Sequence, residues 1–306
     1  MRNLDAIEEH QSSAAAPYVA TLQLAAGATL SLALPGVGER VLASRGGGAG
    51  ELKLESIPPS SAAHADPGNP VSRIANWAWQ GRSEGLRLRH EKGLGPTTAL
   101  GDKAAAACAA ALAVATLTGK SLRWQQVAAW LADDGAEPAT DGDGAVAAAW
   151  HGGAWFDLGQ GPLRAAPSIN LRLVVIMPGE GVLPVRYEGA ELPLPPLVRA
   201  GLADLDLRAM GAAPTRPRLD HPAWQAAAKA ARAAGAAYVH VANGGHSLVA
   251  LTDEAERAGA IRVAAIDAFA AEGIWSRGRA GPLNLRGALD SLTRRPNAEP
   301  GGHPQP

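Results

Sequence analysis

The alternation of apolar and polar residues predicts paired β-strands near the start of the chain. Residues 18–34, YVATLQLAAGATLSLAL, are rich in apolar and β-branched residues and contain a glycine turn, so we expect two short strands there. The alternating stretch ELKLESI, at 51–57, predicts another short strand. Leu86 and Leu88 alternate with arginines and predict a strand that runs directly into Gly93.

Helical patterns are interspersed with these strands. In NPVSRIANWAWQ the helix is expected to begin at Asn69, which is followed by a proline. An alanine-rich helix is expected from about Thr98 to Thr118, where a glycine ends it. Ser121 is the candidate N-cap of a third helix, SLRWQQVAAWLADD.

The second half of the chain mixes both patterns without strict alternation. AVAAAWHGGAWFDLG predicts a helix that breaks at two glycines into a strand, and LRLVVIMPG predicts a buried strand. A helix near 194–211 is followed by a helix, two strands around an NGG turn, a further helix and a last strand near Trp275. This order predicts an α+β protein of two layers.

Composition favours a small-molecule partner. The 306 residues include 28 Lys and Arg against 29 Asp and Glu, and without a basic block they give no support to a nucleic-acid partner. The single cysteine, Cys108, lies in the alanine run, which excludes an internal disulfide and favours a buried thiol. The acidic N-terminus does not have the pattern of a signal peptide and no apolar run has membrane-spanning length, so we expect a soluble, cytoplasmic protein that does not bind a membrane; a homodimer is left open.

A glycine turn before the alanine-rich helix is the main candidate for chemistry. The turn GLGPTT occupies residues 93–98, and backbone amides of such a turn can hold a phosphate beside the positive end of a helix. Lys92 and Lys103 flank it, and Thr97 is placed where a hydroxyl can bind the magnesium of a nucleotide. From these residues alone, a phosphate site and a purely structural strand-to-helix turn both remain open. Trp77 and Trp79 precede the turn and are candidates for the border of an adenine pocket.

Five segments in order resemble the GHMP kinase superfamily, and within it most nearly the homoserine kinases. GLGPTTALGDKAAAACAAALA resembles the GLGSSAA phosphate loop and its helix, and AAPYVATLQLAAGATLSLAL resembles the opening strand pair. GNPVSRIANWAW, DGDGAVAAAWHGG and AAGAAYVHVANGGHSLVALTD are similar to three further family segments. The matches extend over about residues 14–290.

The resemblance implies an α+β GHMP kinase fold that uses ATP and Mg²⁺. Its N-terminal domain, similar to domain 2 of ribosomal protein S5, would occupy residues 1–160, its ferredoxin-like C-terminal domain 161–290, and a disordered tail 291–306. The substrate would lie between the domains. The implied cofactor-binding residues are Lys92, Gly93, Leu94, Gly95, Pro96, Thr97 and Thr98. The implied metal ligands are Thr97 and Asp143, and the implied catalytic residues are Asp141, Asp143 and His246.

Several positions depart from the family pattern. Pro96 replaces a serine and removes one backbone donor, and Leu22 and Gly189 lie where the family binds its acceptor with polar residues. The family's acidic metal ligand aligns with Thr140, or with Glu137 if one gap is allowed.

Three functions therefore remain for the structure to separate. The first is transfer of the γ-phosphate of ATP to a small alcohol other than homoserine. The second is a non-kinase enzyme of the same fold that acts on a phosphorylated sugar, as β-ribofuranosylaminobenzene phosphate synthase does. The third is a pseudokinase that serves as a binding module.

Overall fold

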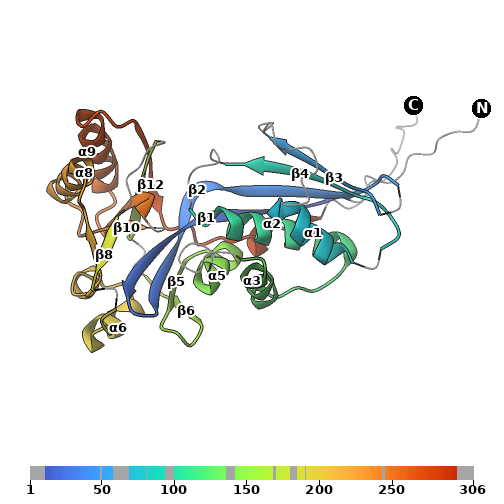
Figure 1. The fold of residues 1–306 in the computed structure, drawn as a ribbon, viewed down its shortest axis with the longest axis horizontal. Helices are drawn as coiled ribbons and strands as arrows, with labels where there is room; N and C mark the ends of the chain where they lie inside the picture. Colours follow the sequence, from blue (N-terminus) through green and yellow to red (C-terminus); the bar gives the residue numbers. More distant parts are fainter. Residues whose placement is uncertain are drawn as a thin grey trace, which may run out of the picture.

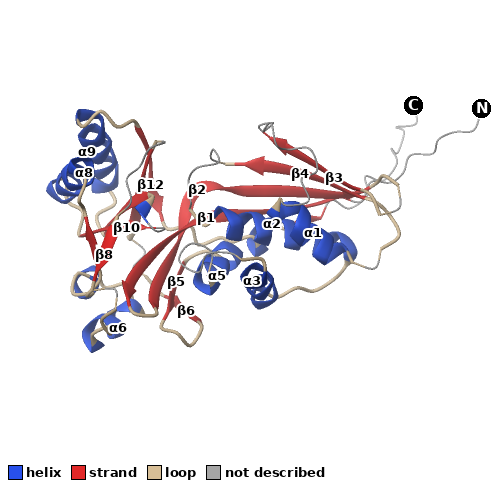
Figure 2. Ribbon diagram, in the orientation of Figure 1, coloured by secondary structure: helices blue, strands red, loops and turns tan. Residues whose placement is uncertain are grey.

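Two larger sheets, mostly antiparallel and each with helices on one face, and one two-stranded sheet make up the described part of the protein (Figure 1). The computed structural model describes residues 11–48, 50–57, 69–80, 82–93, 100–135, 142–167, 170–179, 185–189, 191–242 and 245–294. The expected α+β class is confirmed (Figure 2).

The first sheet is built on a long hairpin. Its strands are β1 (Gln11–Ala25), β2 (Ala28–Arg45), β3 (Leu52–Ile57), β4 (Leu86–Lys92), β5 (Ala154–Asp157), β6 (Pro162–Ala165) and β13 (Thr293–Arg294). The order is β13-β1-β2-β4-β3, and β5 with β6 continues the sheet beside the turn end of β2. The two strands expected within 18–34 are confirmed, but they extend well beyond that range in both directions.

Four helices cover one face of this sheet: α1 (Pro70–Trp79), α2 (Asp102–Thr118), α3 (Trp124–Asp133) and α5 (Asp143–His151) (Figure 1). The alanines of α2 are buried, and their small side chains let the helix approach β1 and β2 closely. Cys108 is buried among them, as expected. Asn69 caps α1 as predicted, because its Oδ1 accepts a hydrogen bond of 2.9 Å from the backbone N of Val71.

Two predicted helix starts are wrong. Helix α2 begins at Asp102 instead of Thr98, after Gly101 adopts a left-handed conformation that glycine tolerates (φ 59°). Helix α3 begins after Arg123 instead of Ser121, because Gln126 Oε1 accepts the backbone N–H of Arg123 in a capping box.

The second sheet has the ferredoxin-like arrangement. Strand β7 (Arg172–Pro178) is followed in the chain by α8 (Pro222–Ala233), β10 (Tyr238–Ala242), β11 (Ser247–Thr252), α9 (Arg257–Ala271) and β12 (Ser276–Pro282). The strand order is β10-β11-β7-β12, and the chain order is βαββαβ. Helices α8 and α9 lie together on one side of this sheet (Figure 1).

An insertion between β7 and α8 contains β8 (Arg186–Glu188), α6 (Pro196–Leu202), α7 (Leu207–Met210) and β9 (Arg216–Arg218). The single helix expected near 194–211 is therefore wrong. Leu205 has a positive φ of 51°, and Asp206 then caps α7, so the chain turns between two short helices. This insertion contacts the tip of the β1–β2 hairpin through the bonds Ala26 N to Leu192 O (3.0 Å) and Thr215 N to Leu24 O (3.2 Å).

The C-terminal segment returns to the first sheet. Asn284 exchanges backbone hydrogen bonds with Ala33 and Gly153, and a short helix, η2 (Leu289–Ser291), leads to β13, which pairs with β1. Two residues of the predicted tail, Thr293 and Arg294, are thus paired, and residues 295–306 lie outside the described part of the chain.

Candidate functional site

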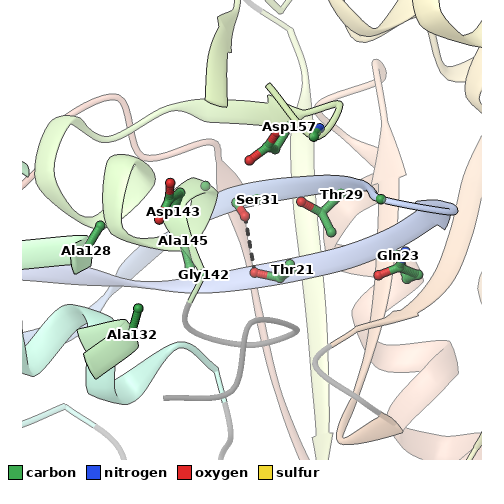
Figure 3. Close-up of a pocket in the computed structure, with 13 residues that line it drawn as sticks. Thr21, Gln23, Thr29, Ser31, Ala128, Ala132, Gly142, Asp143, Ala145 and Asp157 are labelled. Atoms are coloured by element: carbon green, nitrogen blue, oxygen red, sulfur yellow. Dashed lines mark hydrogen bonds between the residues drawn. The ribbon is translucent and has the colours of Figure 1, made fainter. Parts of the chain in front are cut away.

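A cavity of about 630 Å³ lies at the turn end of the β1–β2 hairpin, beneath the start of α5 (Figure 3). We call it the hairpin cavity. Strands β1, β2 and β5 form one wall, and helices α3 and α5 form another. The lining residues are Thr21, Gln23, Gly27, Thr29, Ser31, Ala128, Ala132, Gly142, Asp143, Gly144, Ala145, Asp157 and Gly159.

The sheet side of the hairpin cavity is polar. Thr21 pairs with Ser31 and Gln23 with Thr29 across the hairpin, so these four side chains, the polar row, share one face of the sheet. Thr21 and Ser31 are 5% and 1% exposed, and their hydroxyls lie 3.2 Å apart in a mutual hydrogen bond. Burying a hydroxyl costs free energy unless the hydroxyl is hydrogen-bonded, and apolar side chains are therefore usual on a sheet face that helices cover. The polar row departs from that pattern.

Helix α5 brings an acidic residue to this row. Its N-cap is Gly142, which offers no side-chain cap, and its first residue is Asp143. A Cβ on Gly144 would lie 3.0 Å from Ser31 Oγ, closer than nearly all Cβ contacts, so glycine lets the helix pack against β2 here without displacing that hydroxyl. Figure 3 shows the Asp143 side chain beside the polar row.

The environment of Asp143 shifts the pKa of its carboxyl upward. Burial raises the pKa of the Asp143 carboxyl, and the nearby charge of Asp157 raises it further. The positive end of α5 acts in the opposite direction, because a helix N-terminus stabilises a carboxylate. A carboxyl with a raised pKa that faces a cavity is typical of a group that exchanges protons.

Asp157 is a candidate that the sequence analysis missed. It lies at the end of β5 opposite Thr29, and its Oδ1 accepts backbone hydrogen bonds from Gly159 (2.7 Å) and Gly161 (3.2 Å). Those bonds fix the carboxylate at the cavity edge (Figure 3). The sequence contains a signal for the turn, an aspartate followed by glycines two and four residues later, but none for its proximity to Asp143.

Most of the predicted phosphate loop lies outside the described residues. Leu94, Gly95, Pro96, Thr97 and Thr98 lie outside the described residues, as does Asp141. Lys92 ends β4 opposite Glu39, and a Cβ on Gly93 would meet the backbone oxygen of Gly38 at 2.4 Å. The loop therefore leaves the sheet through a close backbone contact that requires glycine at position 93.

The start of α2 differs from a simple phosphate site. The carboxylate of Asp102 accepts hydrogen bonds from the backbone amides of Asp102 and Lys103, so it occupies donors that a phosphate would use. Burial raises the pKa of Asp102, and the adjacent Glu39 raises it further. Glu39 is itself buried and hydrogen-bonded to Tyr18 and His90. A phosphate near α2 would thus depend on loop amides and on Lys92 or Lys103.

The remaining candidates lie elsewhere. His246 is exposed in the β10–β11 turn, where its backbone N bonds to Ala242 O (3.1 Å), and it does not line the hairpin cavity. Trp77 and Trp79 lie beside the far end of α2, because Lys120 Nζ donates to the carbonyl of Ala78 (2.9 Å). A helix of 17 residues is about 25 Å long, so these tryptophans do not border the start of α2.

The described ranges contain neither a cluster of metal-binding side chains nor a membrane-spanning helix. Within the described ranges, no group of three or more His, Cys, Asp or Glu side chains is arranged to hold a metal ion. None of the helices found in these ranges is both long and apolar enough to cross a bilayer.

Comparison with known proteins identifies the fold. No protein-family model matches the chain, and the search of curated proteins gives no match. Among solved structures, a homoserine kinase from Cytophaga hutchinsonii is 18% identical with a TM-score of 0.71, covering 96% of this chain and 100% of that one. A mevalonate kinase from methicillin-resistant Staphylococcus aureus is 15% identical with a TM-score of 0.56 (90% and 99% covered). A mevalonate diphosphate decarboxylase from Staphylococcus aureus is 12% identical with a TM-score of 0.62 (94% and 98% covered).

These similarities extend over nearly the whole length of each chain. The protein has the GHMP kinase fold, and the resemblance seen in the sequence is confirmed at that level. At 12–18% identity the comparisons establish the fold and leave the reaction to be argued from the site.

Proposed function

We propose that the protein is a GHMP-type kinase that transfers the γ-phosphate of ATP to a hydroxyl of a small metabolite bound in the hairpin cavity. The observation that carries this proposal is the hairpin cavity itself, in which Asp143 faces the polar row. The neighbours of this fold include kinases of small alcohols, which supports the same reaction class.

Each described group has a role that its position supports. Asp143 accepts the proton of the acceptor hydroxyl, since it lines the cavity beside the polar row and its pKa is raised by burial and by Asp157. The polar row and Asp157 orient the acceptor. Lys92 and the loop that begins at Gly93 would hold the phosphates of ATP.

The residues are compatible with Mg²⁺ bound together with ATP. Carboxylate oxygens are ligands that Mg²⁺ prefers, and it commonly takes one or two from the protein and others from the phosphates. Asp143 is the described carboxylate that fits, with Thr97 and Asp141 as further candidates. When bound, the ion would neutralise phosphate charge.

One observation favours a second candidate, a binding module without kinase activity. Asp102 and the buried Glu39 place acidic groups at the start of α2, which opposes the binding of a triphosphate there. The same fold also occurs in a decarboxylase.

Calorimetry with ATP and Mg²⁺ tests the proposal. The wild type is expected to bind, and Lys92→Gln and Thr97→Ala are expected to weaken binding about tenfold, as loss of one charge-assisted contact does. Lys53→Gln is the matched control, because Lys53 is exposed on β3 and pairs with Glu51.

ADP release over a panel of alcohols then measures turnover. Asp143→Asn is expected to lose turnover and to retain binding of ATP measured without Mg²⁺. No ATP binding by the wild type would refute the kinase, and binding without turnover of any alcohol would support the binding module.

A further inference from the structure

The charge of the hairpin cavity is unusual for a site that would accept an acid. Two of its described lining residues, Asp143 and Asp157, are acidic, and none is Lys, Arg or His. The described lining of the cavity therefore carries acidic side chains without a basic partner.

Neighbouring backbone and side chains do not remove this charge. The start of α5 contributes about half a positive elementary charge, which is small against two carboxylates. Residues 136–141, which precede Gly142, lie outside the described residues. A carboxylate-bearing ligand in this cavity would face like charge without a partner.

The rest of the lining favours a ligand with several hydroxyl groups. Along one wall lie the Thr29 hydroxyl and the side chain of Gln23, whose amide nitrogen donates to Ala25 O, beside the mutually bonded hydroxyls of Thr21 and Ser31; alanines and glycines of α3 and α5 form the opposite wall. A volume of about 630 Å³ falls in the range of small-molecule sites and exceeds the need of a three- or four-carbon alcohol.

The two carboxylates mark different ends of the polar row. Asp157 pairs with Thr29, whereas Gly144, next to Asp143, lies against Ser31. Thr29 and Ser31 are two residues apart on one strand, which is about 7 Å. A ligand that meets both carboxylates therefore extends along the polar row from Thr29 to Ser31, as a sugar or cyclitol ring with two polar substituents can.

We infer that the acceptor is a polyhydroxylated amine, such as an amino sugar or aminocyclitol, whose ammonium group binds Asp157 while a hydroxyl faces Asp143. This inference rests on the proposed function, since it names the substrate class of the same site. Asp157 determines specificity through charge, and its Oδ1 remains bound to the turn amides of Gly159 and Gly161.

Calorimetry without nucleotide tests the inference independently of turnover. The probes are two sets matched in size and differing in charge: glucosamine, glucose and glucuronate, and 4-aminobutanol, butanediol and 4-hydroxybutanoate. Mg²⁺ alone is a separate titration. The variant is Asp157→Asn, which keeps an oxygen acceptor for the turn amides and removes the charge. Asp267→Asn, exposed on α9, is the matched control.

In the wild type glucosamine is expected to bind about 10- to 100-fold more tightly than glucose, with glucuronate weaker still, and to bind more tightly than 4-aminobutanol. Asp157→Asn is expected to reduce the affinity for the amine to that for the neutral compound, with the neutral compound unchanged, and Asp267→Asn to change neither.

The inference would be overturned by equal binding of amine and neutral compound, by preference for the acid, by no binding of either amine, or by Asp157-dependent binding of Mg²⁺ without binding of an amine. Binding of the amine that depends on Asp157, together with no ADP release in the presence of ATP, would retain the ligand class and refute the kinase.

Discussion

Helices α2 and α5 begin with the same two residue types and have opposite surroundings. Each has a glycine N-cap followed by an aspartate: Gly101 and Asp102 in α2, Gly142 and Asp143 in α5. Gly101 is left-handed and turns Asp102 inward, where its carboxylate bonds to the first amides of its own helix. Gly142 is extended, and Asp143 projects into the hairpin cavity.

A helix that begins with glycine and aspartate can therefore use the aspartate in two ways, at its own first amides or at a cavity. Both aspartates have a pKa raised by burial and by a second carboxylate, Glu39 for Asp102 and Asp157 for Asp143. Asp143 lines the hairpin cavity, whereas residues 94–99, in the loop before Gly101 and Asp102, lie outside the described residues. The sequence motif predicted a site at the start of α2, whereas the hairpin cavity lies at the start of α5.

The largest expected effect is on turnover, and it separates the two aspartates. Asp143→Asn is expected to reduce kcat by about 10²- to 10⁴-fold, the usual contribution of a positioned acid or base. Asp102→Asn is expected to change kcat by less than about threefold, because it lies away from the hairpin cavity. Rates of ADP release at saturating ATP measure both. A larger loss for Asp102→Asn than for Asp143→Asn would reverse the assignment.

The next effect is steric and tests how α5 is placed. Gly144→Val puts a branched side chain at a position where Cβ already lies 3.0 Å from Ser31 Oγ, so we expect a loss of about 1–3 kcal/mol in the free energy of unfolding. Gly259→Ala in α9, where a Cβ meets nothing within 4 Å, is the control and is expected to stabilise slightly. Urea denaturation measures both changes. An unchanged midpoint for Gly144→Val would mean that α5 does not need its close contact with β2.

Local sequence patterns predicted most elements but could not place the site. The cap at Asn69, the glycine break after α5 and the alternation in β4 are local signals, and the structure has each element. The helix expected at 194–211 failed because Leu205 adopts a conformation that no local pattern indicates. Asp157 and Asp143 come together only through the pairing of β5 with β2 and the packing of α5 on Ser31, which are tertiary contacts.

A smaller effect tests whether Asp102 serves the helix instead of a ligand. Asp102→Ala removes the side-chain acceptor for the first amides of α2 and is expected to cost about 1 kcal/mol of unfolding free energy. Asp102→Asn retains an acceptor oxygen and removes a buried charge beside Glu39, so it is expected to cost less than Asp102→Ala at pH 7. Urea midpoints of the two variants measure the difference in unfolding free energy. Equal losses in both variants would show that the charge of Asp102, and not its acceptor oxygen alone, stabilises the fold.

The smallest effect is the pH dependence of stability at Asp143. Its folded-state pKa lies above the ordinary value of 3.8, so the folded protein binds this proton more tightly than the unfolded chain does. Stability from this group is therefore highest below the ordinary pKa and falls as pH rises through the folded pKa. Asp143→Asn, which does not ionise, is expected to raise Tm by about 1 °C at pH 7, with a smaller difference at pH 4. Thermal unfolding of both proteins at the two pH values measures this. A Tm gain that is larger at pH 4 than at pH 7 would contradict the raised pKa. Asp143 would then behave as an ordinary exposed aspartate, and the start of α5 would lose the property that sets it apart.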